Sequence, residues 1–309
     1  MIETDNAVRF VDAFVDKLDL TQLSFVVNDI KSEGRPAFNP KVFLKIYLYG
    51  YLNGLRSSRK LEKECKRNIE LQWLTGKLTP NYHSIADFRK VNSLALRNTF
   101  KLFVLFLKDA DLITGKIIAV DGTKVRAHNS KKNNYNPKKI ERHLQYIEEK
   151  TNEYLKQLDG NDSNDDLMKV NQVQEKLNRL NENKIKYEVL SEKLEKSGEP
   201  QVSTTDEDAR ALLVHGQVVE VSYNTQAAVD EKHKLVVATH TLNRNDRNAL
   251  SRISIEAKEN IGSENITVLS DKGYHNGREI QTCKDNNIDT ICAQQVIINS
   301  NEKGTTPEY

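Results

Sequence analysis

Long apolar runs and paired cysteines are missing from this sequence of 309 residues. Without a run of about 20 apolar residues, no membrane-spanning helix is expected. The amino terminus carries Glu3 and Asp5 and has no apolar core behind a basic start, so we expect no signal peptide and a cytoplasmic location. The 3 cysteines are far apart and form no Cys-x-x-Cys pair, which argues against a disulfide framework and against a zinc site.

Common nucleotide-binding and hydrolase motifs are absent as well. The sequence has no Gly-x-x-x-x-Gly-Lys-Ser/Thr, no Gly-x-Ser-x-Gly and no His-Glu-x-x-His. A hydrophobic content of 38% in a chain of this length predicts about two domains with their own cores. The formal net charge is only +2, so the distribution of charge is more informative than its sum.

Residues 1–112 have apolar side chains at three- and four-residue spacing, which predicts helices. Asn39 followed by Pro40 is typical of a helix start, and Gly54 of a helix end. We therefore expect an all-helical amino-terminal domain.

Two helices of this domain are rich in arginine and lysine. The first continues to about Arg67, and Ser57 or Ser58 can cap it. The second runs through Lys90, and Ser84 can cap it. Two short basic helices joined by a turn can lie across DNA, although a solvated basic face on a helical bundle explains the composition equally well. The candidate DNA-binding residues are Arg56, Arg59, Lys60, Lys63, Lys66, Arg67, Arg89 and Lys90.

From about residue 113 the pattern changes to strands. We predict strands 117–120, 218–229, 235–242, 266–270 and 290–293, a turn at 230–233, and helices 246–261 and 277–286. Strand, hairpin, helix, strand is the order of the ribonuclease H-like α/β fold, in which the first and fourth strands lie side by side.

An insertion at about residues 131–200 separates the first strand from the hairpin. Two apolar stripes at helical spacing, with a polar break at 159–164, predict an antiparallel helical hairpin. Such stripes seal two helices together, and dimerisation or contact with DNA are alternatives.

Two aspartates follow apolar runs at strand ends. Asp121 ends the run 117–120, and Asp271 ends the run 266–270. Carboxylates suit Mg²⁺ or Mn²⁺, and such ions can neutralise charge at a phosphodiester. A single aspartate at a strand end is usually a turn or cap residue. Two of them in this topological order predict a metal-dependent site for nucleic-acid phosphoryl transfer.

Further polar residues follow each aspartate. His128 is a candidate for a DNA contact or for plain surface, and Tyr274 and His275 could orient a phosphate or a flanking base. Clustered positive charge beside a reaction centre attracts phosphates. The basic candidates after Asp121 are Lys124, Arg126, Lys131 and Lys132.

Several segments, spread over nearly the whole chain, resemble one protein family. They are 38–41, 51–62, 83–89, 121–124, 205–210, 223–230, 243–246 and 270–274. In this order they resemble bacterial insertion-sequence transposases of the DDE class. The resemblance implies a helical DNA-binding domain at 1–112 and a ribonuclease H-like catalytic domain at 113–309. It also implies Asp121 and Asp271 as catalytic metal ligands, and binding of double-stranded DNA at transposon terminal repeats, with a homodimer possible.

One departure from the family is serious. The third acid of the family, a glutamate on a later helix, has no counterpart, because Glu302 and Glu308 lie in polar stretches. The expectation is therefore an incomplete core, from a transposase truncated within its catalytic domain and impaired in strand transfer. The alternative is a non-catalytic DNA-binding remnant that occupies transposon ends.

Overall fold

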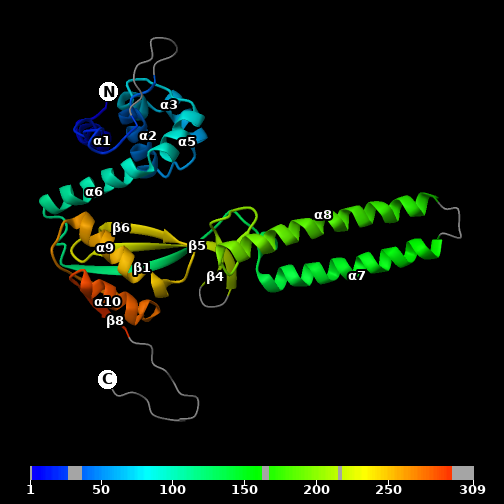
Figure 1. Cartoon of the computed structure of the whole chain (residues 1–309). Helices are drawn as coiled ribbons and strands as arrows, with labels where there is room; N and C mark the ends of the chain where they lie inside the picture. The colour runs from blue at the N-terminus through cyan, green and yellow to red at the C-terminus, as the bar shows by residue number, and fades with distance from the viewer. Residues whose placement is uncertain (1, 27–36, 162–166, 215–217, 294–309) are drawn as a thin grey trace. The chain divides into compact units, whose positions relative to one another are not determined.

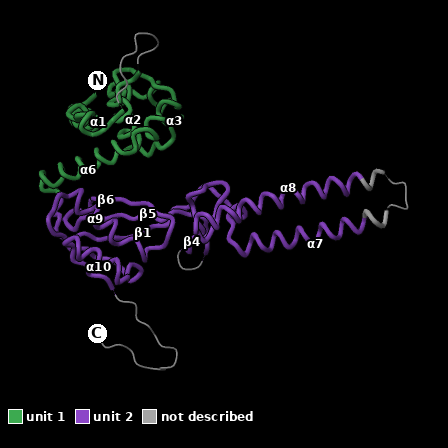
Figure 2. Tube along the Cα trace, in the orientation of Figure 1, with its two compact units in different colours: residues 1–112 green, residues 113–309 purple. Residues whose placement is uncertain are grey.

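The chain divides into two compact units, Met1–Leu112 and Ile113–Tyr309 (Figures 1 and 2). The computed structural model describes residues 2–26, 37–161, 167–214 and 218–293. The division falls where the sequence pattern changes from helix to strand. No helix of these residues is long and apolar enough to cross a membrane.

Unit 1 is helical, and asparagine side chains begin most of its helices. Asn6, Asn39, Asn68 and Asn81 each accept a hydrogen bond from a backbone N–H of the first turn. Such caps satisfy amides that have no partner within the helix. The helices are α1 (Ala7–Asp16), α2 (Pro40–Leu52), α3 (Ser58–Arg67), α4 (Ile69–Leu74), α5 (Tyr82–Val91) and α6 (Ser93–Asp109).

Two predictions for this unit need correction. Ser84 does not cap α5, because its own N–H donates to the Asn81 side chain at 2.8 Å. Ser57 occupies the position before α3 but makes no side-chain cap hydrogen bond. The short helix α4 between the two basic helices was not predicted, because six residues are too few to show a helical period.

Unit 2 is built around a mixed sheet. Within it, β1 (Ile117–Arg126) pairs antiparallel with β5 (Val218–Asp230) and parallel with β7 (Ile266–Ser270). The sheet continues from β5 to β6 (Val236–Leu242) and from β7 to β8 (Ile288–Cys292), while β4 (Arg210–Val214) pairs with the first half of β5. The predicted pairing of the first and fourth strands is therefore confirmed.

The first strand is longer than predicted. It continues past Val120 to Arg126, because β5 stays paired with it as far as Ser222. Asp121 therefore lies within β1 rather than at its end. Strand β4 was also missed, and the predicted last strand begins two residues earlier, at Ile288.

Helices cover one face of this sheet. Helix α9 (Leu250–Ile261) contacts β1, β5, β6 and β7, and α10 (Gly277–Asp285) contacts α9 and β8. Alternate residues of β1 point to opposite faces. Ile118 and Val120 are buried, whereas Ala119 and Asp121 are exposed. Asp121 therefore projects from the opposite, more open face.

The insertion forms the predicted antiparallel helical hairpin (Figure 1), of α7 (Pro137–Asn161) and α8 (Leu167–Ser197). Helix α7 extends through the predicted break at 159–161, and 162–164 lie outside the described residues. At the base, Ile140, Leu190 and Leu194 pack together, and the ring of His143 stacks on Tyr187 at 4.7 Å. The hairpin is thus sealed by its own apolar stripes.

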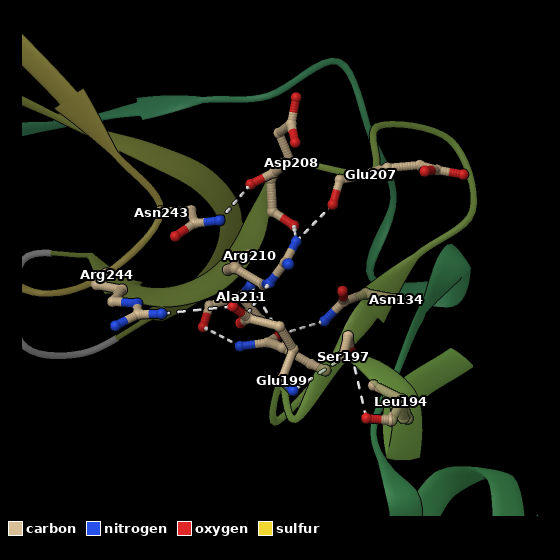
Figure 3. A network of polar contacts seen from close by, with 12 residues as sticks. Asn134, Leu194, Ser197, Glu199, Glu207, Asp208, Arg210, Ala211, Asn243 and Arg244 are labelled. Carbon is tan, nitrogen blue, oxygen red and sulfur yellow. Dashed lines mark hydrogen bonds and ion pairs between the residues drawn. The ribbon is translucent and has the colours of Figure 1, made fainter. Parts of the chain in front are cut away.

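A polar network joins the end of α8 to the sheet (Figure 3). Glu199 lies 3.6 Å from the Arg210 guanidinium and 3.4 Å from that of Arg244. Arg210 also donates to the backbone carbonyl oxygens of Glu207 and Ala209, at 2.5 and 3.0 Å. This carboxylate thus connects the hairpin to β4 and to the segment after β6.

Candidate functional site

The register of β1 and β7 brings the two predicted aspartates together. The last register pair of these parallel strands is Val120 with Ser270, and each aspartate follows immediately. Neighbouring strands lie roughly 4.8 Å apart. Both aspartates are exposed. Asp121 and Asp271 therefore form an exposed pair at adjacent positions of neighbouring chain segments.

Each carboxylate of this pair keeps one oxygen available. Asp121 Oδ1 accepts the N–H of Gly122 at 2.7 Å, and Asp271 Oδ1 accepts the N–H of Gly273 at 2.8 Å. The two Oδ2 atoms have no hydrogen-bond partner among the described residues. Two exposed carboxylate oxygens fit a Mg²⁺ or Mn²⁺ ion that retains several of its waters.

A metal site made of three or more protein side chains is not present in the described part of the chain. No group of three His, Cys, Asp or Glu side chains there could hold a metal ion. Asp121 and Asp271 together offer two spare carboxylate oxygens, so water or substrate oxygens would have to complete the coordination of a cation there.

Asp246, which was not among the predicted site residues, lies beside Gly122, the residue that follows Asp121. It opens η2 (Asp246–Asn248), which precedes α9. Its Oδ1 accepts from Asn224 Nδ2 at 2.8 Å and from Gln226 Nε2 at 3.0 Å, and its Oδ2 lies 2.6 Å from Lys124 Nζ. Its sequence signals were its place at the entry to a helix and its position in segment 243–246, which resembles the transposase family.

The surroundings of Asp246 favour its ionised form. Burial raises the pKa of this carboxyl, but hydrogen bonds from Lys124, Asn224 and Gln226 outweigh burial and lower the pKa below its ordinary value. Lys124 is therefore engaged by a carboxylate, and not free to attract phosphates as the sequence suggested.

Tyr274 is buried rather than presented to a substrate. Only 1% of the residue is exposed, and its hydroxyl donates to Gln226 Oε1. Burial raises its pKa, and the charges of Asp246, Asp121 and Asp271 raise it further. The hydroxyl therefore stays protonated as a donor, and the expectation that it orients a phosphate or base is wrong.

The remaining basic candidates of unit 2 lie on the surface. Arg126 ends β1, Lys131 and Lys132 lie in η1 (Lys131–Asn133), and His128 is exposed between them. The side chains of Arg126, Lys131 and Lys132 make no hydrogen bond or ion pair with the described residues. They remain available to an anionic partner.

In unit 1, α3 has a basic face and a buried face. Leu61 and Cys65 are fully buried. Lys60, Lys63 and Arg67 follow one another at three- and four-residue spacing, which places them together on the opposite side of the helix. The predicted basic helix thus has a continuous positive stripe that faces away from the core.

Some basic residues of unit 1 have partners within the protein. Lys66 pairs with Glu62 at 2.7 Å, and Arg67 pairs with Glu64. Two others lie over aromatic rings: Arg59 over Tyr82 at 5.0 Å, and Arg89 over Tyr47 at 5.9 Å. Within the described residues, the predicted candidates of unit 1 whose side chains make no hydrogen bond or ion pair are Arg56, Arg59, Lys60, Lys63 and Lys90.

Comparison with known proteins gives one family. Residues 1–91 match the model of a family described as Transposase domain (DUF772). The matched part includes α1 to α5, with the basic stripe of α3. This match supports a transposase. No curated protein and no solved structure matches the chain.

Proposed function

We propose that this chain is a DNA transposase of the DDE class, or a copy of one with impaired chemistry. The observation that carries the proposal is the parallel pairing of β1 with β7, because it brings Asp121 and Asp271 side by side. The sheet order β6-β5-β1-β7-β8 agrees with a ribonuclease H-like core that α7 and α8 interrupt. The transposase-domain match over residues 1–91 is an independent support.

Asp121 and Asp271 would hold the catalytic cation. When bound, Mg²⁺ or Mn²⁺ supplies charge neutralisation at a scissile phosphate. The chain's own contribution is to present two carboxylates on a rigid sheet and to direct each spare oxygen toward solvent. A cation held by only two protein ligands would bind less firmly than one held by three, which supports the expectation of weak activity.

Unit 1 would bind the DNA. Lys60 and Lys63 on the stripe of α3, together with Arg56 and Lys90, carry positive charge that no carboxylate of the described residues neutralises. Cations of this kind release counterions from duplex DNA, so affinity depends steeply on salt. The expected partner is double-stranded DNA at the terminal repeats of a transposable element.

The alternative is a non-catalytic DNA-binding protein that occupies transposon ends. It is favoured by the lack of a three-ligand metal group among the described residues. Both functions share DNA binding by unit 1, and they differ in whether the Asp121/Asp271 pair binds a cation.

Titration with Mn²⁺, followed by its electron paramagnetic resonance signal, separates the two functions. The full chain should bind Mn²⁺, and Asp121→Asn or Asp271→Asn should each weaken that binding. Asp289→Asn is the matched control, because Asp289 is an exposed aspartate of the same sheet, on β8. Equal Mn²⁺ affinity in all four proteins would contradict the metal site. If the chain then still binds duplex DNA with the sequence that flanks its gene, and binds it less tightly as salt rises, the non-catalytic DNA-binding function is supported.

A further inference from the structure

The segment that carries Asp271 is weakly held by main-chain hydrogen bonds. Strand β1 remains paired with β5 beyond Asp121, as far as Arg126. Strand β7, by contrast, ends at Ser270, and the chain turns into η3 (Lys272–Tyr274). The Cys292 thiol lies 3.2 Å from the Asp271 carbonyl oxygen, which is a weak contact. The Asp271 carbonyl oxygen also accepts the Tyr274 N–H within η3, at 3.3 Å, and the Ser270 carbonyl oxygen accepts the Ala293 N–H at 3.4 Å. These long main-chain contacts leave a role for a further interaction in fixing the position of Asp271.

Tyr274 provides that interaction by reaching across β1. It lies at the end of η3, and its hydroxyl donates to Gln226, which belongs to β5. In the sheet, β1 lies between β5 and β7. The contact therefore spans the strand that carries Asp121, and it ties the Asp271 segment to the far neighbour of that strand.

Gly122 makes this crossing possible. It is the register partner of Gln226 on β1, directly after Asp121. A Cβ atom there would lie 2.5 Å from Asp246 Oδ1 and 3.0 Å from Asn224 Oδ1, and it would collide with the Gln226 amide nitrogen. Only a residue without a side chain leaves room for these groups above β1.

Asp246 and Lys124 close the connection. Gln226 donates to Asp246, and Asp246 pairs with Lys124, which lies on β1 three positions after Asp121. The side chains of Lys124 and Asp246 are 15% and 24% exposed, so the pair is partly shielded from solvent. The chain of contacts thus begins beside Asp271 and returns to the strand of Asp121.

We propose that Tyr274, Gln226, Asp246 and Lys124 form a positioning bridge that passes over Gly122 and fixes Asp271 relative to Asp121. Asp246 acts in this bridge as a positioning residue and not as a metal ligand. A cation shared by two carboxylates binds tightly only if their separation is set before it arrives, and groups that orient the ligands set it. This inference rests on the proposed function for its metal, but not for its geometry.

Two substitutions test the bridge from opposite sides. Tyr274→Phe removes the hydroxyl and keeps the buried ring, and Gly122→Ala fills the crossing point. In the full chain, each should weaken Mn²⁺ binding by roughly 10- to 100-fold, which is typical when a group that orients a metal ligand is lost. Hydrogen exchange of residues 270–276 should become faster, because the Asp271 segment loses its anchor.

Tyr223→Phe is the matched control. Tyr223 is also on β5, and its hydroxyl donates to the Asp206 carboxylate at 2.6 Å, outside the bridge. Its loss should leave both Mn²⁺ affinity and exchange of residues 270–276 unchanged. Circular dichroism of each variant verifies that the sheet is intact.

The outcomes separate this inference from the proposed function. If Asp121→Asn weakens Mn²⁺ binding and Tyr274→Phe does not, the bridge is overturned and the metal site stands. If the unmodified chain binds no Mn²⁺, the metal site falls, and the exchange measurement alone decides on the bridge. In that case, unchanged hydrogen exchange of residues 270–276 in Tyr274→Phe would overturn the bridge.

Discussion

The Lys124 ammonium and the Asp246 carboxylate lie 2.6 Å apart, although 122 residues separate them in the chain. The pair joins β1 to the entry of α9, next to the two exposed aspartates. Lys124 therefore helps to organise the site, and its charge is balanced by a carboxylate within the protein.

Replacing Asp246 with asparagine should make the stability of unit 2 less dependent on pH. In the folded chain, the pKa of Asp246 is below its ordinary value of 3.8. The contribution of its charge to folding stability is therefore present above pH 3.8 and is lost as the pH falls through the folded-state pKa. Asp246→Asn should cost about 1–3 kcal/mol of unfolding free energy near neutral pH, because it loses charged hydrogen bonds.

Urea unfolding followed by circular dichroism measures this difference. The difference in unfolding free energy between Asp246→Asn and the unsubstituted chain should shrink below pH 3.8, where protonation removes the charge of Asp246 in the unsubstituted chain as well. Glu264→Gln, at an exposed glutamate between α9 and β7, controls for the loss of a carboxylate. A difference that stays constant between about pH 2 and 7 would contradict the assigned role of the charge.

Removing two lysines from the stripe of α3 should weaken DNA binding. Lys60→Gln together with Lys63→Gln deletes two charges whose side chains make no hydrogen bond or ion pair with the described residues. The slope of log affinity against log salt should fall in magnitude by about 2, since each phosphate contact contributes about 0.9. Fluorescence anisotropy with duplex DNA at several salt concentrations measures it. Lys101→Gln, at an exposed lysine of α6, should leave the slope unchanged.

Replacing Asp230 with alanine should destabilise unit 2 selectively. Its buried carboxylate accepts hydrogen bonds from Thr114 and from the N–H groups of Gly115 and Lys232. Leaving these donors without a partner should cost roughly 2–4 kcal/mol. The single tryptophan, Trp73, lies in α4 of unit 1 and reports on that unit alone.

In Asp230→Ala, the circular dichroism transition should therefore shift to lower urea while the Trp73 fluorescence transition stays in place. Asp206→Ala, a less buried carboxylate of the same unit, is the comparison variant. Parallel shifts of both signals would show that the two units unfold together, against the expectation.

The two arginines that contact Glu199 should differ in importance. Arg210 is 11% exposed and also donates to two backbone carbonyl oxygens, whereas Arg244 is 66% exposed. Arg210→Ala should destabilise unit 2 by about 1.5–3 kcal/mol and Arg244→Ala by less than about 1 kcal/mol. Urea unfolding by circular dichroism compares them, and the reverse order would contradict the role given to burial.

Much of the local structure was predictable. Strand β7 has the predicted bounds, and the helical hairpin was anticipated from the spacing of apolar residues. The pairing of the first and fourth strands was anticipated from the order of the elements. Errors fell on the end of β1, on the cap of α5 and on the short elements α4 and β4. Their extents depend on a neighbouring strand or on one competing side chain, which a periodic pattern does not reveal.

The candidate site was predicted in part. Asp121 and Asp271 each follow an apolar run, so the sequence drew attention to both. Asp246 and Gln226 follow no comparable pattern, and Tyr274 was expected to orient a phosphate or a base although it is buried. Burial of a polar residue depends on which partners reach it, and those partners are distant in the chain.

The sequence by itself determined which long segments are helical or extended, which of their faces are apolar, and that two acids follow apolar runs, because these properties depend on residues close together in the chain. Only the tertiary structure decided that Tyr274 crosses β1 at Gly122 to meet Gln226. That contact joins residues 48 positions apart. It exists because the register of three strands sets a glycine beneath it, and register is a property of the assembled sheet.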